Sequence, residues 1–290
     1  MKAPAFEYIK PRTIDHVFAL LAEYGDEARL LAGGQTLMAT LNMRLSEPAV
    51  VIDITGIDAL RGIALSADGS MLRIGALVTH SEIEASALVA AHTPLLTMAV
   101  PHVAHRAIRN LGTWGGSIAY ADPAAEWPAC ALALDAVVLV RGKGGERRIA
   151  AADFFLDLYT TALAEGEIVT ACEIPARQSN QRFAFDELAR RHGDYAIVGL
   201  AVAARLIEGR LADTRLAYLG IGTTPVRARK TEQFLDGQAP QVTVLLKAAQ
   251  ILATEFSGEA APLGDLTNSA ATKRHLATVL LQRTLANLAA

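Results

Sequence analysis

The sequence predicts an α+β protein in two parts, an α/β part over residues 1–177 and an antiparallel sheet with helices over 178–290. Helix and strand signals alternate through the first part, whereas the second part begins with long strand-like runs and ends in helical patterns. A polar stretch over 177–181 lies between them and has the composition of a linker. With 290 residues, 52% of them hydrophobic, the chain is long enough for two domains of ordinary size.

The first part is expected to form two subdomains, over about 1–60 and 61–177. Thr13 is a suitable N-cap for an amphipathic helix, and Gly25 is suited to end it. Pro48 prevents the next helix from continuing far. After the first helix, the elements expected up to residue 60 are a strand over 29–32, a helix over 36–45 and a strand over 49–53.

Capping and turn signals place the elements of the second subdomain. Thr79-His80-Ser81-Glu82 fits a capping box, in which a hydroxyl and a carboxylate satisfy free amides at a helix start. A glycine cluster over 112–116 is expected to break the helices between about 92 and 135, and Asp122-Pro123 offers an N-cap and a first helical proline. The strands expected are 72–76, a hairpin of 136–141 with 146–149, and 168–175.

The second part reads as a sheet followed by helices. Its strand-like runs are too closely spaced for helical crossovers, which favours antiparallel pairing. The strands expected are 182–188, 195–207 and 211–222, and the helices expected are about 241–254 and 270–288.

A first glycine-rich segment, Ala32-Gly33-Gly34-Gln35-Thr36, lies between an expected strand and an expected helix. Glycines let the backbone approach a ligand closely, and free amides at such a turn can converge on phosphate oxygens. Gln35 and Thr36 add side-chain donors. A helix cap or tight turn without a ligand would use the same residues, and the local pattern leaves both interpretations open.

A second glycine-rich loop runs from Asn110 to Ser117 and is followed by Asp122. The adjacent glycines 115 and 116 leave room for a diphosphate or a ribityl chain, while Thr113 and Ser117 have hydroxyls that can donate hydrogen bonds. Asp122 can accept hydrogen bonds from sugar hydroxyls, or it can serve only as a helix N-cap. Trp114 and Trp127 are either aromatic partners of a flavin ring or buried core residues.

Several classes of protein are disfavoured. With 27 Lys plus Arg against 30 Asp plus Glu, the formal charge of −3 gives no reason to expect nucleic acid as a partner. No stretch is apolar for long enough to span a membrane and no signal peptide is visible, so a cytoplasmic location is expected. The two cysteines, Cys130 and Cys172, are too few for an iron–sulfur cluster and are expected to be buried apolar residues.

Common catalytic motifs are also absent from the sequence. The G-x-G pairs at 142–144 and 220–222 lack a third glycine in place for a dinucleotide fingerprint, and no Walker A pattern occurs. Gly115-Gly116-Ser117-Ile118-Ala119 ends in alanine where a hydrolase elbow has glycine. His102 and His105 lie three residues apart without an evident cysteine or carboxylate nearby, so a metal site is not expected.

Taken in register, the motifs resemble those of the medium, FAD-binding subunit of the xanthine dehydrogenase and carbon monoxide dehydrogenase family. The resemblance extends from Phe6-Glu7-Tyr8 to Thr224-Pro225-Val226-Arg227-Ala228, nearly the whole chain. It depends on the two glycine-rich loops, on Ala121 to Glu126 and on Arg191 to Tyr195. Each motif alone is weak, but their order and spacing match the family as a set.

The resemblance implies a two-subdomain FAD-binding domain of the vanillyl-alcohol-oxidase type, followed by the C-terminal domain of these flavin subunits. By this resemblance the two loops jointly hold the diphosphate of FAD. The residues assigned to the loops are Ala32, Gly33, Gly34, Gln35, Thr36, Gly112, Thr113, Gly116 and Ser117. Asp122 corresponds to an aspartate that hydrogen-bonds the cofactor, Ala104 to a small residue lining the flavin site, and Tyr195 to an aromatic residue covering the isoalloxazine. No catalytic residue and no metal ligand is expected in this chain.

The resemblance also implies partners. A large subunit would carry molybdopterin and oxidise the organic substrate, and a small subunit would carry two [2Fe-2S] clusters that pass electrons to FAD and then to an external acceptor. The expected assembly is a dimer of heterotrimers. Two alternatives are a self-contained flavin oxidase or dehydrogenase acting on a small alcohol or amine, and an adaptor subunit without cofactor.

One position departs from the family pattern. Some relatives have a lysine near the flavin about eight residues before the tyrosine, where this chain has Glu187 beside Asp186. A cation there would stabilise a reduced, anionic flavin, so an acid either lowers the flavin's reduction potential or points elsewhere.

Overall fold

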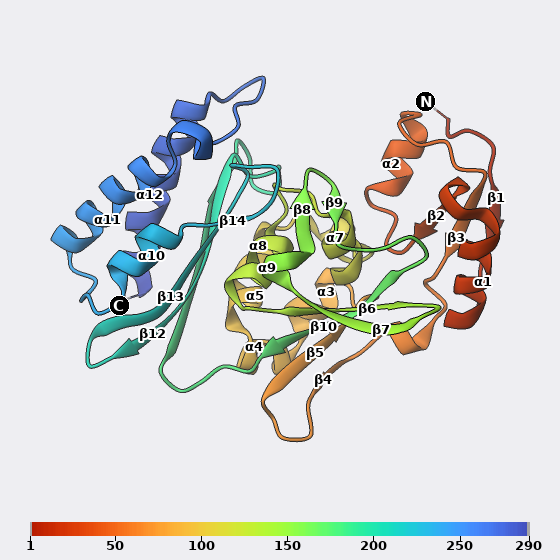
Figure 1. Ribbon diagram of the computed structural model, residues 1–290, viewed down its shortest axis with the longest axis horizontal. Helices are drawn as coiled ribbons and strands as arrows, with labels where there is room; N and C mark the ends of the chain where they lie inside the picture. Colours follow the sequence, from red (N-terminus) through yellow and green to blue (C-terminus); the bar gives the residue numbers. More distant parts are fainter. Residues whose placement is uncertain (1, 289–290) are drawn as a thin grey trace.

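The computed structural model describes residues 2–288, and residues 2–60 form a small subdomain around a parallel sheet of order β1-β3-β2. Its elements are β1 (Glu7–Ile9), α1 (Ile14–Tyr24), the 3-10 helix η1 (Gly25–Glu27), β2 (Ala28–Leu31), α2 (Leu37–Asn42), β3 (Val50–Asp53) and η2 (Asp58–Leu60). The buried Val17 and Phe18 of α1 pack with Ile52 of β3 in one core. This subdomain forms one end of the molecule (Figure 1).

Most of its elements are those that the sequence predicts. Thr13 caps α1 by accepting a hydrogen bond from the amide of His16, and Gly25 ends the helix with φ 48°. The second helix is shorter than expected and ends at Asn42, because Arg44 has φ 57° and the chain leaves the helical conformation there. Strand β1 was not anticipated, since three residues carry too little pattern to identify a strand.

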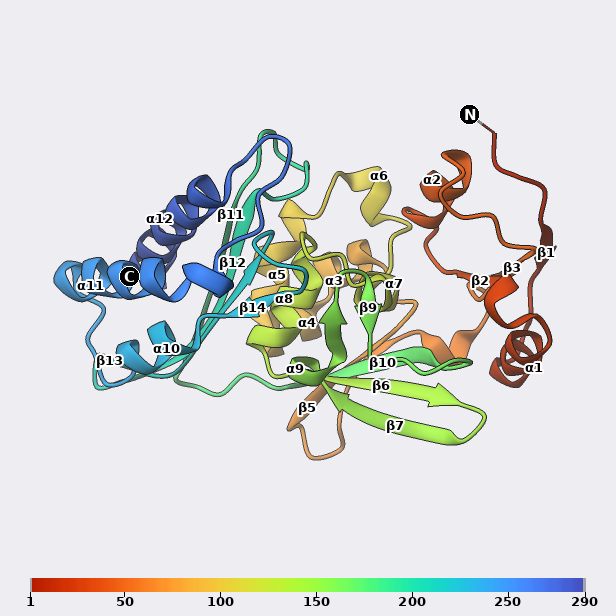
Figure 2. The same ribbon diagram turned by 45° about the horizontal axis from the view of Figure 1, so that its top comes forward.

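The central subdomain packs helices against a five-stranded antiparallel sheet of order β4-β5-β10-β6-β7. Its strands are β4 (Ile63–Leu65), β5 (Met71–Gly75), β6 (Val137–Gly142), β7 (Gly145–Ala150), the short pair β8 (Phe155–Asp157) and β9 (Thr160–Thr161), and β10 (Ile168–Pro175). Its helices are α3 (His80–Ala85), α4 (Ala87–His92), α5 (Pro94–Ala99), η3 (Val100–His102), α6 (Arg106–Arg109), α7 (Trp114–Tyr120), α8 (Glu126–Ala133) and α9 (Ala151–Phe154). Figure 2 shows these helices gathered on one side of the sheet.

The glycine cluster breaks the helices as expected, between α6 and α7, but the break ends before Gly115. Thr113 caps α7 by accepting from the amide of Gly116, so that Gly115 and Gly116 lie in the first turn of this helix. The expectation for Asp122 is wrong. Asp122 does not cap α8, which begins at Glu126 after a turn. Its carboxylate instead accepts from the amide of Ala124 inside that turn. The capping box of Thr79 and Glu82 and the hairpin β6–β7 are confirmed.

The C-terminal part contains an antiparallel sheet of order β11-β12-β13-β14, confirming the expected class. Its elements are β11 (Gln181–Leu188), β12 (Val198–Ile207), β13 (Arg210–Leu219), β14 (Val226–Arg227), α10 (Arg229–Leu235), α11 (Val242–Glu255), η4 (Gly258–Ala260) and α12 (Ala270–Leu288). Helices α10 to α12 cover one face of this sheet, and α5 and α8 of the central subdomain pack on the other face (Figure 1).

Two strand boundaries in this part differ from the sequence prediction. Strand β12 begins at Val198 rather than at Tyr195, because a turn with Gly193 at φ 86° occupies the preceding residues. Strand β13 ends at Leu219, because Gly220 at φ 80° turns the chain away. Within the described residues, no helix is both long and apolar enough to cross a membrane.

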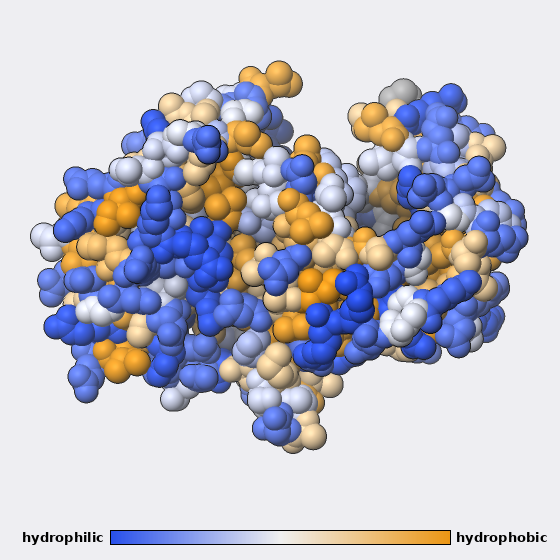
Figure 3. All heavy atoms as spheres, in the orientation of Figure 1, coloured by the Kyte–Doolittle hydropathy of each residue, from blue (hydrophilic) through white to orange (hydrophobic). Residues whose placement is uncertain are grey.

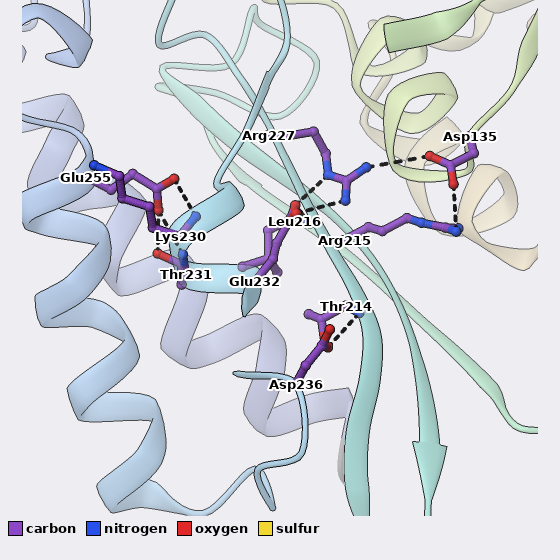
Figure 4. Close-up of polar contacts among 10 residues, drawn as sticks. All are labelled: Asp135, Thr214, Arg215, Leu216, Arg227, Lys230, Thr231, Glu232, Asp236 and Glu255. Carbon is purple, nitrogen blue, oxygen red and sulfur yellow. Dashed lines mark hydrogen bonds and ion pairs between the residues drawn. The ribbon is translucent and has the colours of Figure 1, made fainter. Parts of the chain in front are cut away.

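Ion pairs join the central subdomain to the C-terminal sheet (Figure 4). Asp135 lies two residues after the end of α8. Its carboxylate oxygens lie 2.6 Å from the guanidinium of Arg215 and 3.6 Å from that of Arg227. Arg227 also forms a two-point pair with Glu232 of α10, and both of these side chains are more than nine-tenths buried. Glu232 further accepts the backbone amide of Leu216, at 2.8 Å. The buried pair thus connects β13, β14 and α10.

A Glu232→Gln substitution is expected to lower the free energy of unfolding by about 3 kcal/mol, because it leaves the buried guanidinium of Arg227 without its main counter-charge. Denaturant unfolding of the isolated chain measures this loss. The matched control is Asp213→Asn on the exposed pair with Arg205, which should cost less than about 1 kcal/mol. Equal losses in the two variants would contradict the assignment of Glu232 as a structural charge.

Candidate functional site

The two glycine-rich loops, far apart in the sequence, meet in the structure. A Cβ atom at Gly33 would overlap the carbonyl oxygen of Leu111 and lie 2.8 Å from the Cα of Gly112. A Cβ at Gly116 would lie 3.9 Å from the Cβ of Ala32. These distances show that the two loops approach each other as closely as two backbones can. In Figure 3 the surface of the molecule is hollowed at its upper edge, between the N-terminal subdomain and the centre.

The first loop has free hydrogen-bond donors. Within residues 2–288, none of the backbone amides from Gly33 to Thr36 donates a hydrogen bond to the protein. Gly34 has φ 70°, which turns the backbone sharply here. Consecutive free amides in such a turn form a concave site for an anion, and α2 begins immediately afterwards. The loop has the donor set that a diphosphate requires.

Side chains of this loop have different roles. Gln35 uses its amide nitrogen to donate to the carbonyl of Gly33 at 2.8 Å, and so braces the loop. Thr36 stands at the N-cap position of α2 but makes no side-chain capping bond, which leaves its hydroxyl available for a ligand.

The second loop contributes differently from what the sequence suggests. The amides of Trp114 and Gly115 donate to carbonyl groups of Val78 and Ala76, and those of Gly116 and Ser117 donate to Thr113. These amides are therefore occupied and do not form a second row of free donors. The backbone of this loop is instead held in place by its own hydrogen bonds and forms a surface facing the first loop. Glycine at position 112 permits the close approach of Gly33. The hydroxyls of Thr113 and Ser117 remain able to donate hydrogen bonds to a ligand.

His80 packs against Gly112 and holds the second loop in place. Its Nδ1 accepts a 2.9 Å hydrogen bond from the indole of Trp127, and its amide donates to the carbonyl of Gly112 at 2.9 Å. A Cβ at Gly112 would lie 2.7 Å from the His80 Nε2. Burial and the nearby charge of Arg109 lower the pKa of His80 from 6.5 to about 4. The ring is therefore neutral at pH 7, with its proton on Nε2 because Nδ1 is an acceptor.

Acid should destabilise the protein through His80. Its pKa in the folded state is depressed, so the unfolded chain binds more protons between pH 6.5 and about 4, and stability falls across that window as the pH is lowered. The expected contribution is about 3 kcal/mol. Unfolding free energies at pH 7 and 4.5 should differ less in His80→Gln than in the wild type, since other acidic groups titrate equally in both. The same pH dependence in the two proteins would refute this role.

A cleft of about 840 Å³ lies between the central subdomain and the C-terminal part. Asp122 and Tyr120 line it from the end of α7, Tyr159 from the turn before β9, and Tyr195 from the turn before β12. Burial raises the pKa of Asp122, although its carboxylate accepts a 2.9 Å bond from Ala124. Partial burial and nearby acidic groups, Asp122 first among them, raise the pKa of Tyr195 to about 12. Most of its ring nevertheless faces the open cleft, with 70% of the residue exposed.

Ala104 lies against the turn that carries Tyr195. A Cβ at Gly193 would be 2.7 Å from the carbonyl oxygen of Ala104, so the two backbones touch. Arg109 donates to the carbonyls of Val103 and Ala104 while its guanidinium pairs with Glu84. Ala104 itself has φ 45°, a strained conformation that these contacts hold.

Helix α7 connects the two groups of predicted residues. It begins at the second glycine loop and ends beside the cleft, where Ala121 has φ 55° and directs the chain into Asp122. Seven residues of helix span roughly 10 Å, the scale of the linker between the diphosphate and the ring of a flavin dinucleotide. The second loop and the cleft therefore lie at opposite ends of α7.

Other candidate residues are accounted for by the core. Trp114 and Trp127 are fully buried and pack on each other, with their ring centroids 5.4 Å apart. Neither ring faces the cleft. Cys130 and Cys172 are buried free thiols, as expected. No cluster of three metal-binding side chains occurs among the described residues. The sequence did not predict one contact, in which a carboxylate oxygen of Glu187 lies 3.6 Å from Nδ1 of His102. This contact arises only from the tertiary fold.

Comparison with protein-family models decides the family. Residues 4–177 match the FAD binding domain in molybdopterin dehydrogenase, and residues 183–288 match the CO dehydrogenase flavoprotein C-terminal domain. The chain belongs to the FAD-binding subunits of the molybdopterin dehydrogenases. It is a medium, flavin-carrying subunit, and in such complexes molybdopterin and the iron–sulfur clusters are carried by other subunits.

Relatives and solved structures agree with this placement. The chain is 35% identical to the 6-hydroxypseudooxynicotine dehydrogenase complex subunit alpha of Paenarthrobacter nicotinovorans, over 99% of this chain and 95% of the relative. It is 33% identical to the carbon monoxide dehydrogenase medium chain of Hydrogenophaga pseudoflava, over 98% and 97%. A carbon monoxide dehydrogenase structure from Hydrogenophaga pseudoflava superposes with a TM-score of 0.94 and 35% identity, covering 100% of this chain and 98% of that one.

Proposed function

We propose that FAD lies along α7, with its diphosphate between the glycine-rich loops and its isoalloxazine in the cleft. The row of free amides from Gly33 to Thr36, directly against Gly112, carries this proposal. Ala32, Gly33, Gly34, Gln35 and Thr36 would hold the diphosphate, with Gly112, Thr113, Gly116 and Ser117 as the opposite wall. Asp122 would accept hydrogen bonds from the cofactor, Ala104 would line the flavin site, and Tyr195 would cover the ring.

The chain's own residues bind and orient the cofactor rather than act on the organic substrate. FAD supplies the redox chemistry when bound, since it exchanges electrons singly or in pairs. The free amides would neutralise charge on the diphosphate, and the close contact of Gly33 with Gly112 fixes the first loop against the second. Tyr195, exposed in the cleft, controls access to the ring.

The assembly is proposed to be a dimer of heterotrimers in the cytoplasm. A small iron–sulfur subunit would deliver electrons to this chain, and a large molybdopterin subunit would oxidise the substrate. Curated relatives named as medium subunits, such as the nicotine 6-hydroxylase medium subunit of Paenarthrobacter nicotinovorans, support this role. Free buried thiols suit a reducing compartment. We place the boundary between the domains at residues 177–178, with subdomains of about 1–60 and 61–177.

Purification of the chain with and without its partners tests the function. The isolated chain should bind about one FAD per polypeptide, released by acid because no covalent attachment is expected. Tagged chain from the native source should bring down a cysteine-rich small subunit and a large subunit. A chain that bound FAD, oxidised small alcohols or amines alone and retained no partner would instead be a self-contained flavin enzyme.

A further inference from the structure

Arg109, the last residue of α6, folds its side chain back along this short helix. Its Nη1 donates to the carbonyl oxygens of Val103 and Ala104, at 3.2 and 3.4 Å, and both of these residues precede the helix. Its Nε donates to a carboxylate oxygen of Glu84 in α3, at 3.4 Å. The side chain of Arg109 is only 11% exposed. One largely buried guanidinium therefore joins α3 to the turn that precedes α6.

The backbone of that turn needs support from outside. Ala104 has φ 45°, in the left-handed region that residues other than glycine adopt only with strain. A guanidinium presents several donors in fixed directions, so it can hold two successive carbonyl groups and a carboxylate at the same time. A lysine would bring the same charge without this fixed set of donors. Arg109 is therefore suited to fix the direction of the Ala104 carbonyl.

The same carbonyl oxygen of Ala104 contacts the turn that carries Tyr195. A Cβ at Gly193 would lie 2.7 Å from this oxygen, so the two backbones are already as close as glycine allows. Beside this contact, the rings of His102 and His192 stack with their centroids 6.1 Å apart. Tyr195 follows two residues after Gly193 and lines the cleft. The position of the Ala104 carbonyl therefore sets how closely Tyr195 approaches the central subdomain.

Helix α3 also holds the second glycine-rich loop. The hydroxyl of Ser81 donates to the side-chain oxygen of Asn110, at 2.8 Å, and the amide of His80 donates to the carbonyl of Gly112, at 2.9 Å. Both contacts come from the first turn of α3, whereas Glu84 lies near its other end. One helix thus contacts the loop at its start and, through Glu84, the turn before α6 at its end.

We propose that Arg109, held by Glu84, is a positioning residue that sets Tyr195 relative to the second glycine-rich loop, acting through the carbonyl of Ala104. The inference rests on the proposed function, in which the loop holds the diphosphate and Tyr195 covers the isoalloxazine. No bond forms or breaks at Arg109, because its part is to hold a carbonyl group in place. Loss of the guanidinium should leave the diphosphate contacts intact and withdraw the aromatic ring from the flavin.

Arg106 provides a matched control for this role. It lies on the same helix, and its Nη1 reaches the same carboxylate oxygen of Glu84, at 3.2 Å. Its side chain is 68% exposed and, within residues 2–288, donates to no backbone carbonyl. Arg106→Gln and Arg109→Gln therefore each remove one arginine from Glu84. Only Arg109→Gln also releases the carbonyl groups of Val103 and Ala104.

NMR of the cofactor-free chain tests whether Arg109 positions Tyr195. With carbon-13 in the tyrosine rings, the Tyr195 signal is assigned by its loss in Tyr195→Phe. Arg109→Gln should move this signal, and Arg106→Gln should leave it at the wild-type position. If Arg109→Gln did not fold, Arg109→Lys, which keeps the charge beside Glu84, should move the signal while Arg106→Lys does not. An unchanged Tyr195 signal in the folded Arg109 variant would overturn the inference.

Fluorescence of the FAD-loaded chain tests the consequence for the cofactor. Arg109→Gln should retain about one FAD per chain, with flavin fluorescence at least about twofold above wild type because the aromatic ring no longer stacks on the flavin. Arg106→Gln should match wild type. Loss of FAD from Arg109→Gln would mean that Arg109 supports the diphosphate loop instead, and would overturn the inference.

A double variant tests the route through Ala104. Gly193→Ala disturbs the same contact from the other side, so Arg109→Gln should add nothing to its effect on flavin fluorescence. Additive effects would overturn this route. If the wild-type chain bound no FAD, the proposed function would fail at that measurement, and the Tyr195 signal of the cofactor-free chain would still decide whether Arg109 positions the turn.

Discussion

Gly33→Ala is expected to abolish FAD retention, reducing cofactor content from about one per chain to less than about a tenth. The added Cβ would overlap the carbonyl oxygen of Leu111 and approach the Cα of Gly112 to 2.8 Å. Both neighbours are backbone atoms, so no rotation of a side chain relieves the overlap. The loops must separate, and the free amides of the first loop lose their position against the second. Absorbance of the purified protein and titration with FAD measure the loss.

Gly144→Ala is the matched control for this substitution. Gly144 lies in the turn of the β6–β7 hairpin, also without a positive φ, and no atom stands within 4 Å of the added Cβ. It adds the same methyl group in open space and should keep FAD at the wild-type level. Full FAD content in Gly33→Ala would show that the diphosphate does not lie between the loops.

Elements with strong local signals were predictable. The capping box of Thr79 and Glu82, the N-cap Thr13 and the hairpin across the turn 142–145 each encode a hydrogen-bonding pattern within a few residues. Strand β10 was placed correctly because its apolar run ends at a proline, Pro175. Short or weakly patterned elements such as β1, β14 and α10 were not anticipated, since their formation depends on partners distant in the sequence.

The glycines at 33, 34, 112 and 116 predicted two ligand loops, and the structure brings these loops together. That they hold a ligand stays a prediction, and the hydrogen-bonding role of each residue could not be predicted from the sequence. Nothing local reveals that the amides after Thr113 are already bonded to Ala76, Val78 and Thr113, or that His80 braces the loop from another helix. The pairing of Glu187 with His102 is likewise invisible, because β11 and η3 meet only through the packing of the two domains.

Gly193→Ala is expected to leave FAD bound but to displace Tyr195 from the flavin. The residue has φ 86°, which an alanine adopts only with strain, and its Cβ would lie 2.7 Å from the carbonyl oxygen of Ala104. The turn before β12 must move away from the central subdomain and carry Tyr195 with it. Retained FAD should show stronger fluorescence, and electron transfer from the assembled complex to an acceptor dye should fall more than tenfold.

Gly209→Ala separates backbone strain from the clash. Gly209 has a similar φ of 74°, in the tight turn between β12 and β13, but no atom lies within 4 Å of its added Cβ. It should cost about 1 kcal/mol in unfolding free energy and leave flavin fluorescence and electron transfer unchanged. Because both variants share the strained backbone, an effect confined to Gly193→Ala isolates the contact with Ala104 as the feature that sets Tyr195 over the cleft. Matching flavin properties in the two variants would mean that Tyr195 is positioned by some other contact.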